Sequence, residues 1–115
     1  MKLMIFVLND VEKLEAVLAK LEHEGVRGAT ILPSRGMAMA LENYMEGSFL
    51  GSLRAVMEPD REENKTVFAV IKDDQINVAV RAIESVIGNL DNPNTGIIFT
   101  LPVDFVKGLP LGGKE

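Results

Sequence analysis

The 115-residue chain contains no cysteine and only one histidine. The lack of cysteine excludes disulfide bonds, thiolate metal sites and a cysteine nucleophile. The histidine, His23, stands in the charged stretch LEHEG, where a solvated surface residue is expected in preference to a general base or a metal ligand. No nucleophile–base pair, glycine-rich phosphate cradle or metal-ligand cluster is recognisable either. We therefore expect no catalytic site and no metal site.

The chain is acidic: it has 12 Lys and Arg residues and 17 Asp and Glu residues, which give a net charge of −5. Phosphates would be repelled, so a nucleic-acid partner is not expected. No apolar run approaches the length of a membrane span. The first residues, MKLMIFVLND, are followed by Glu12 without a small-residue cleavage site, so they predict a strand and not a signal peptide. A cytoplasmic protein without membrane insertion is the expectation.

The length and the 47% hydrophobic content are typical of one globular domain spanning residues 1–115. Apolar periodicity divides most of the chain into strands and helices. The order is strand, helix, strand, a long middle segment, and again strand, helix, strand. The strands are predicted at Lys2 to Leu8, Arg27 to Ser34, Lys65 to Asp74 and Thr95 to Val103, and the helices in Asn9 to Val26 and Gln75 to Gly88.

Residues that begin and end helices accompany these patterns. Asp10 is a plausible N-cap of the first helix, and Asp73 or Asp74 of the second. Gly25 and Gly88 can supply the left-handed conformation that stops each helix. Pro102 is expected to terminate the last strand.

This order of elements predicts an α+β fold, a ferredoxin-like βαββαβ sandwich. Its four-stranded antiparallel sheet would carry both helices on one face. Right-handed crossovers make the first and third strands the central pair. Both runs, LMIFVL and VFAVI, are strongly apolar and need cover on both sides, but two helices cover only one. The second face should therefore meet copies of the same chain around a symmetry axis.

The middle segment predicts one or two extra short helices between the second and third strands. Four of the six methionines fall in it, and Ser48 is a candidate N-cap. An apolar helix face follows it and is a candidate partner-binding surface: Phe49, Leu50, Leu53 and Met57. The alternative that these side chains pack on the body or on a neighbouring subunit stays open. A membrane surface is less favoured, because the segment lacks a Lys/Arg-rich polar face.

Four pieces of the chain together resemble a known family. They are MKLMIFVL, VRGATILPSRGM, VFAVIKDD and the closing GIIFTLPV. In this order they resemble PII-like signalling proteins, the nitrogen regulatory protein PII superfamily, of which the chain would be a divergent member. The resemblance covers most of the chain outside Ala38 to Lys65. It implies signal transduction by a homotrimer whose sheets line the inside, with three ligand clefts between adjacent subunits.

The resemblance also implies ligand-binding positions. Gly28 and Thr30 match the Gly-x-Thr strand of the family, and Gly36 matches the glycine at the mouth of its long loop, with Met37 in place of the usual Phe. Gly96 is what remains of the family's phosphate loop. From the residues themselves, Arg35 is the best candidate to meet an anionic ligand, because Ser34, Arg35 and Gly36 combine a hydroxyl, a cation and a flexible backbone.

The chain departs from the family where ATP phosphates would bind. Ile97 replaces the phosphate-loop Lys, and Phe68 replaces a Glu on the adenine side. Two C-terminal Arg residues are missing, and only Lys107 and Lys114 are cationic there. Charge-assisted hydrogen bonds are among the strongest that a site can offer. No cofactor is therefore assigned with certainty, and an adenine nucleotide is a possible but disfavoured ligand.

The sequence thus favours a non-enzymatic regulatory protein. It would be a homotrimer that binds a small-molecule effector between subunits and signals to a protein partner through residues 37–65. One alternative is an amino-acid-binding ACT-like module, which more often dimerises. Another is a ferredoxin-like protein with only a structural or partner-binding role. The number of subunits separates the first two.

Overall fold

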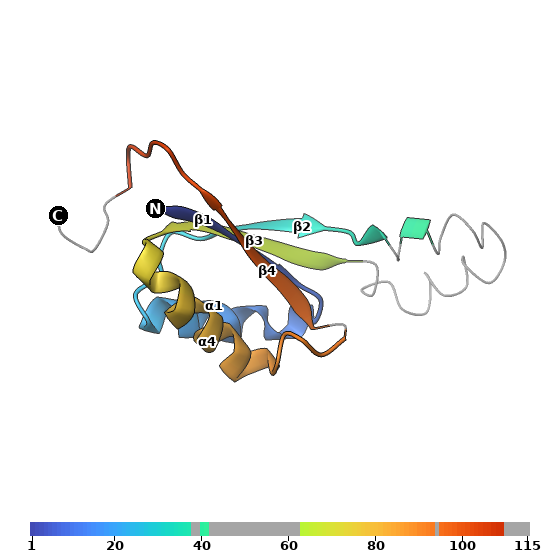
Figure 1. Cartoon of the computed structure of the whole chain (residues 1–115). Helices are drawn as coiled ribbons and strands as arrows, with labels where there is room; N and C mark the ends of the chain where they lie inside the picture. The colour runs from blue at the N-terminus through green and yellow to red at the C-terminus, as the bar shows by residue number, and fades with distance from the viewer. Residues whose placement is uncertain (38–39, 42–62, 94, 110–115) are drawn as a thin grey trace, which may run out of the picture.

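A four-stranded antiparallel sheet forms the centre of the protein, and two helices lie against one of its faces (Figure 1). The computed structural model describes residues 1–37, 40–41, 63–93 and 95–109. Their elements, in chain order, are β1 (Lys2–Leu8), η1 (Val11–Lys13), α1 (Leu14–His23), β2 (Thr30–Ser34), β3 (Asn64–Ile71), η3 (Asp73–Gln75), α4 (Ile76–Ile87) and β4 (Gly96–Pro102).

The strands lie in the order β2-β3-β1-β4, so β1 and β3 are the central pair, as the sequence predicted. β1 is paired along its whole length on both sides. Its register with β3 runs from Lys2 opposite Ile71 to Leu8 opposite Lys65. On its other side, β4 pairs from Pro102 opposite Lys2 to Gly96 opposite Leu8. The prediction of an α+β fold with an antiparallel sheet and two helices is confirmed.

Alternation along the two central strands builds the core. Side chains of successive strand residues point to opposite faces, so every second residue meets the helices. The buried apolar residues of the sheet are Met4, Phe6, Leu8, Val67, Ala69 and Ile71. From the helices they meet Val17, Leu21, Ala79, Ala82 and Ile83. This single core holds α1 and α4 side by side on the same face of the sheet (Figure 1).

Asp10 is the N-cap residue of the 3-10 turn that leads into α1, but its side chain makes no cap hydrogen bond, and neither Asp73 nor Asp74 is the N-cap of the second helix or of its 3-10 turn. Neither helix has a side-chain hydrogen bond at its N-cap, and a 3-10 turn precedes each one. At the first, Lys13 N–H donates to the backbone oxygen of Asp10 at 3.0 Å. At the second, Lys72 N–H donates to the side-chain oxygen of Gln75 at 2.8 Å, which is the bond from the N-cap backbone to the N3 side chain of a capping box.

Asp73 instead links the start of β1 to the turn before α4. Its Oδ1 lies 3.2 Å from the amino group of Met1 and 3.7 Å from Nζ of Lys2. The hydrogen bond from the amino group, and then the positive charges of Lys2 and of that amino group, hold the pKa of Asp73 below its usual value. The ion pair is largely exposed, so salt screens it.

The predicted element ends hold at some positions and shift at others. Gly25 and Gly88 follow α1 and α4 with φ of +95° and +91°, as expected of helix stops. Pro102 is the last residue of β4, as predicted. The second strand, however, begins at Thr30 and not at Arg27, because Gly28, at φ +76°, turns the chain first.

Gly96 is the tightest point of the sheet. It opens β4 opposite Leu8, with φ +153°. A Cβ at this position would lie 2.4 Å from the backbone oxygen of Val7 and 3.1 Å from Cε1 of Phe6. The backbone oxygen cannot move without breaking the β1–β4 ladder. Only glycine therefore lets β4 begin its pairing here.

We predict that Gly96→Ala destabilises the protein strongly. Gly88→Ala is the matched control, because Gly88 also has a positive φ but no atom lies within 4 Å of its added Cβ. The conformational cost common to both is about 1–2 kcal/mol, and the clash at Gly96 should add roughly 1–3 kcal/mol. Urea unfolding monitored by circular dichroism gives both values. Equal losses in the two variants would contradict the steric role of Gly96.

We predict that Asp73 stabilises the fold at neutral pH and not in acid. Its folded pKa is lowered, so its contribution is present above the ordinary value of 3.8 and is lost as the pH falls through the folded pKa. The difference in unfolding free energy between wild type and Asp73→Asn should therefore be constant near pH 7 and shrink toward pH 3. Asp74→Asn is the control. A pH-independent difference, or the same profile for Asp74→Asn, would rule out the ion pair as the cause.

Candidate functional site

The face of the sheet opposite the helices is apolar, and no helix of the described residues covers it (Figure 1). Residues directly opposite in antiparallel strands share a face. The registers therefore place three rows of side chains here. From one end of the sheet to the other, they are Val70, Leu3 and Leu101, then Thr30, Phe68, Ile5 and Phe99, then Leu32, Thr66, Val7 and Ile97. We call these eleven residues the open face.

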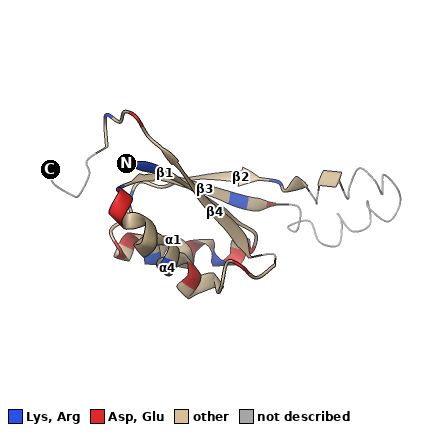
Figure 2. Ribbon diagram, in the orientation of Figure 1, with Lys and Arg blue, Asp and Glu red and all other residues tan. Residues whose placement is uncertain are grey.

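Several large side chains of the open face are in contact with water. Leu32, Ile97, Phe99 and Leu101 are between 44% and 56% exposed. The only charged residues of the four strands are Lys2 and Lys65, and each lies near the start of its strand. Both helices, in contrast, carry acidic and basic residues (Figure 2). A contiguous apolar surface on one side and a charged surface on the other indicate an interaction site on the open face.

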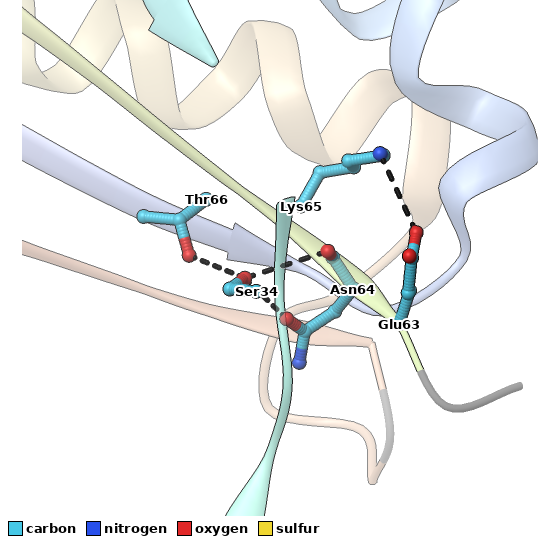
Figure 3. Close-up of polar contacts among 5 residues, drawn as sticks. All are labelled: Ser34, Glu63, Asn64, Lys65 and Thr66. Carbon is cyan, nitrogen blue, oxygen red and sulfur yellow. Dashed lines mark hydrogen bonds and ion pairs between the residues drawn. The ribbon is translucent and has the colours of Figure 1, made fainter. Parts of the chain in front are cut away.

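A polar cluster adjoins the open face where β2 ends and β3 begins (Figure 3). The hydroxyl of Ser34 lies 2.5 Å from Oδ1 of Asn64 and 2.8 Å from the hydroxyl of Thr66, and 3.4 Å from the backbone oxygen of Asn64. Ser34 and Asn64 are opposite each other in the β2–β3 register, and Thr66 is two residues along the same face. These three residues form the polar corner of the sheet.

The charged residues that flank Asn64 in the chain, Glu63 and Lys65, form an ion pair. Nζ of Lys65 is 3.6 Å from the carboxylate of Glu63. Lys65 alternates with Asn64 and Thr66, so its side chain leaves the strand on the helix side, opposite Leu8 in the register (Figure 3). The polar corner itself is therefore uncharged.

Three of the predicted ligand-binding residues directly follow the polar corner. Arg35 is exposed, and Gly36 follows it with the position of its missing Cβ 3.5 Å from the side-chain nitrogen of Asn64. Met37, 77% exposed, begins a helical turn in which Ala40 N–H donates to the oxygen of Gly36 at 3.1 Å. Arg35, Gly36 and Met37 thus lie together at one end of β2.

The other end of β2 holds Gly28 and Thr30. Gly28 lines a groove of about 290 Å³ between α1 and the edge of β2, beside Leu18, Arg27 and Ile31. The C-terminal segment passes close by, because a Cβ on Gly28 would lie 3.8 Å from the side chain of Leu109. Thr30 is the first residue of the strand and lies opposite Phe68 on the open face.

Gly96 lies at the opposite edge of the sheet. It lines a groove of about 420 Å³ between α4 and β4, together with the apolar side chains of Ile76, Val80 and Ile98. The carboxylate of Glu84 also borders this groove and accepts a hydrogen bond from Leu90 N–H at 2.9 Å.

The structure does not bring the six predicted ligand residues together within one chain. They form three groups: Arg35, Gly36 and Met37 at one end of β2, Gly28 and Thr30 at its other end, and Gly96 on β4. β2 and β4 are the two edges of the sheet, and β3 and β1 separate them. The predicted partner residues Phe49, Leu50, Leu53 and Met57 lie outside the described residues.

Other candidates are accounted for by their surroundings. The side chain of His23 is 81% exposed and lies 3.6 Å from a carboxylate oxygen of Glu24, as expected of a surface residue. Among residues 1–37, 40–41, 63–93 and 95–109, no group of three or more His, Asp or Glu residues could hold a metal ion. Within the same part of the chain, no helix has both the length and the apolar character needed to cross a membrane.

Sequence reasoning singled out Ser34 but missed its two partners, Asn64 and Thr66. The available signal was polar residues two positions apart at the start of an otherwise apolar strand. That spacing places both on one face. The pairing with Ser34 depends on the β2–β3 register. The sequence does not give this register, because a long middle segment separates the two strands.

Comparison with models of known protein families and with curated proteins gave no match to this chain. Neither comparison therefore assigns the open face or the polar corner a role.

Proposed function

We propose that this chain is a non-enzymatic, ligand-sensing regulatory protein of the PII-like type that acts as a cytoplasmic homotrimer. The order βαββαβ, with strands arranged β2-β3-β1-β4, supports a ferredoxin-like sandwich as its fold. The resemblance of the four sequence pieces, above all GIIFTLPV, supports the family. The observation that carries the proposal is the uncovered apolar open face.

The open face supports assembly because burying its apolar surface in a contact between copies is favourable. The gain is roughly 25 cal/mol per Å² of apolar surface removed from water. Phe99, Ile97 and Leu101 come from an edge strand that carries no charge. Proteins usually protect exposed edge strands with charges, so an uncharged one is expected to be covered. A second copy of the same chain supplies a matching apolar surface, and closed symmetry then satisfies every copy.

Assembly would also complete the ligand cleft. The predicted ligand residues divide between the two edges of the sheet, with Arg35 and Gly36 beyond β2 and Gly96 on β4. In the proposed trimer, with the sheets facing inward around a three-fold axis, the β2 edge of one copy would lie near the β4 edge of the next. The two groups would then border one cleft between subunits. This accounts for a site whose parts are far apart in the single chain.

The segment that follows β2 would carry the signal to a protein partner. Its described residues Met37 and Leu41 expose apolar side chains, at 77% and 44%. They begin next to Arg35 and Gly36, so a ligand at the cleft would lie beside the segment 37–65. A ligand bound there can shift the segment from one conformation to another only if it binds more tightly to one of the two conformations.

We predict that Phe99→Asp breaks the assembly into monomers. A carboxylate in the middle of the open face would be desolvated without a partner in the trimer, which is strongly unfavourable. Phe105→Asp is the matched control, because Phe105 is 79% exposed and follows the end of β4. Size-exclusion chromatography with light scattering should give three times the 12.6 kDa chain mass for wild type and control, and one chain mass for Phe99→Asp.

A wild-type mass of one chain would refute the assembly. A mass of two chains would refute the trimer and favour the dimeric ACT-like module. In that case, Phe99→Asp would still show whether the open face forms the interface.

We predict that effector binding depends on the assembled state. A thermal-shift panel of nucleotides, dicarboxylates, bicarbonate and amino acids should contain a stabilising ligand, which adds about 2.7 kcal/mol at 100 times its Kd. The shift should persist in Phe105→Asp and vanish in Phe99→Asp, because a cleft between subunits needs two copies. ATP should not be that ligand, since Ile97 stands where a phosphate-binding Lys would be needed. An undiminished shift in monomeric Phe99→Asp would contradict the inter-subunit cleft.

A further inference from the structure

The polar corner has a fixed direction of hydrogen bonding. An amide oxygen only accepts, so the single hydroxyl proton of Ser34 is donated to Oδ1 of Asn64. Ser34 then has no proton left, and the hydroxyl of Thr66 must donate to Ser34. The chain of bonds therefore runs from Thr66 through Ser34 to Asn64. Such chains polarise their members and strengthen the donors at the far end.

The far end of this chain is the side-chain NH2 of Asn64, which has two N–H donors. The hydrogen bonds of Asn64 within the described part of the chain involve its two oxygens and not this nitrogen. In Figure 3, no dashed line joins the nitrogen to the four residues drawn with it. Asn64 is nevertheless only 8% exposed, and it is the one buried polar residue among the described ones. Buried polar groups are almost always hydrogen-bonded in native proteins. A donor that is buried, polarised and without an acceptor among the described residues is the feature on which we base a ligand site.

Gly36 leaves the approach to this nitrogen open. A Cβ on Gly36 would lie 3.5 Å from Nδ2 of Asn64, which is ordinary contact distance. The φ of Gly36 does not lie in the left-handed region, so the backbone does not require glycine here. A side chain at position 36 would nevertheless lie in contact with this nitrogen, and a large one would restrict access to it. The small residue therefore serves access to Asn64.

The charge of the polar corner selects the class of acceptor. Ser34, Asn64 and Thr66 are neutral, and Lys65 is paired with Glu63 on the other face of β3. Arg35, which follows Ser34, already takes part in an interaction of its own. An anion at a site so far removed from water would need a cation to offset its desolvation. A neutral carbonyl oxygen needs only the donors that are present. The open face beside the corner, at Leu32, offers apolar contact for the rest of such a molecule.

We propose that the NH2 group of Asn64, positioned by Ser34 and Thr66, binds the carbonyl oxygen of an uncharged amide-type ligand that approaches past Gly36. This proposal deepens the ligand-sensing function and rests on it, but it does not rest on the trimer. The site lies within one chain, and the ligand class is a carboxamide or urea carbonyl. A carboxylate offers the same kind of oxygen acceptor with a charge, and the test separates the two.

The test uses the full-length chain labelled with ¹⁵N and two probes, N-methylacetamide and acetate, titrated to the same concentration. N-methylacetamide should shift the side-chain NH2 resonances of Asn64 and the backbone resonances of Gly36 and Thr66 along a saturating curve, and acetate should shift them at least tenfold less. Equal or larger shifts with acetate would overturn the neutral-ligand assignment. The absence of shifts at these three residues with both probes would overturn the site.

Two variants test the geometry with the backbone resonances as readout. Asn64→Asp keeps the oxygen that accepts from Ser34 but removes both N–H donors, and Gly36→Val covers them. Each should weaken N-methylacetamide binding at least tenfold, while Asn77→Asp, which makes the same change on an exposed residue of α4, should leave it unchanged. Unaltered binding in Asn64→Asp would overturn the proposal even if Gly36→Val failed to fold.

Failure here is distinguishable from failure of the proposed function. The mass measured by light scattering reports the assembly, and the NMR shifts report the polar corner. A monomeric wild type that still shows shifts at Asn64 would refute the trimer and leave this site intact. A trimer without shifts at Asn64 would do the reverse.

Discussion

The double pairing of β1 is the constraint on which the rest of the structure depends. All seven of its residues have a partner in β3 on one side and in β4 on the other. Because strand side chains alternate, one register fixes both faces of the sheet at once. Met4, Phe6 and Leu8 enter the core under the helices, and Leu3, Ile5 and Val7 are committed to the open face. A slip of one residue would exchange the two sets and expose the largest buried side chain, Phe6.

This constraint makes Gly96 a structural residue of the sheet. β4 can pair with Leu8 only if its first residue has no side chain, because the oxygen of Val7 occupies the space. The resemblance to PII-like proteins gave Gly96 a place in a phosphate loop, but the steric requirement is sufficient to explain the glycine. The two roles are compatible, since the same residue borders the groove between β4 and α4.

The features of the fold that were predictable from the sequence are those set by burial. The order of elements, with right-handed crossovers, predicted the central pair, and the apolar runs of β1 and β3 agreed with it. Glycines with positive φ marked the ends of both helices. The hydrogen bonds at the helix starts were less predictable, because several neighbouring polar residues could each have supplied the acceptor. An aspartate suits a helix start, yet Gln75 accepts the bond before α4, and Asp73 meets the charges at the start of β1 instead. The polar corner required the β2–β3 register, which no local pattern contains.

The position of the polar corner relates ligand binding to assembly. Asn64 and Ser34 stand at the end of the open face, directly after the row that contains Thr66 and Leu32. If copies of the chain cover the apolar rows, the corner lies at the rim of that contact and not in its centre. A ligand held by Asn64 would then touch both its own chain and the approaching copy. Coupling between two binding events is reciprocal, so a ligand that favours the assembled state would itself bind more tightly to it.

The same geometry places Gly36 and Met37 beside the ligand, at the start of the segment proposed to carry the signal. Three neutral side chains at one corner of an apolar sheet would thereby connect ligand, assembly and output without any catalytic group.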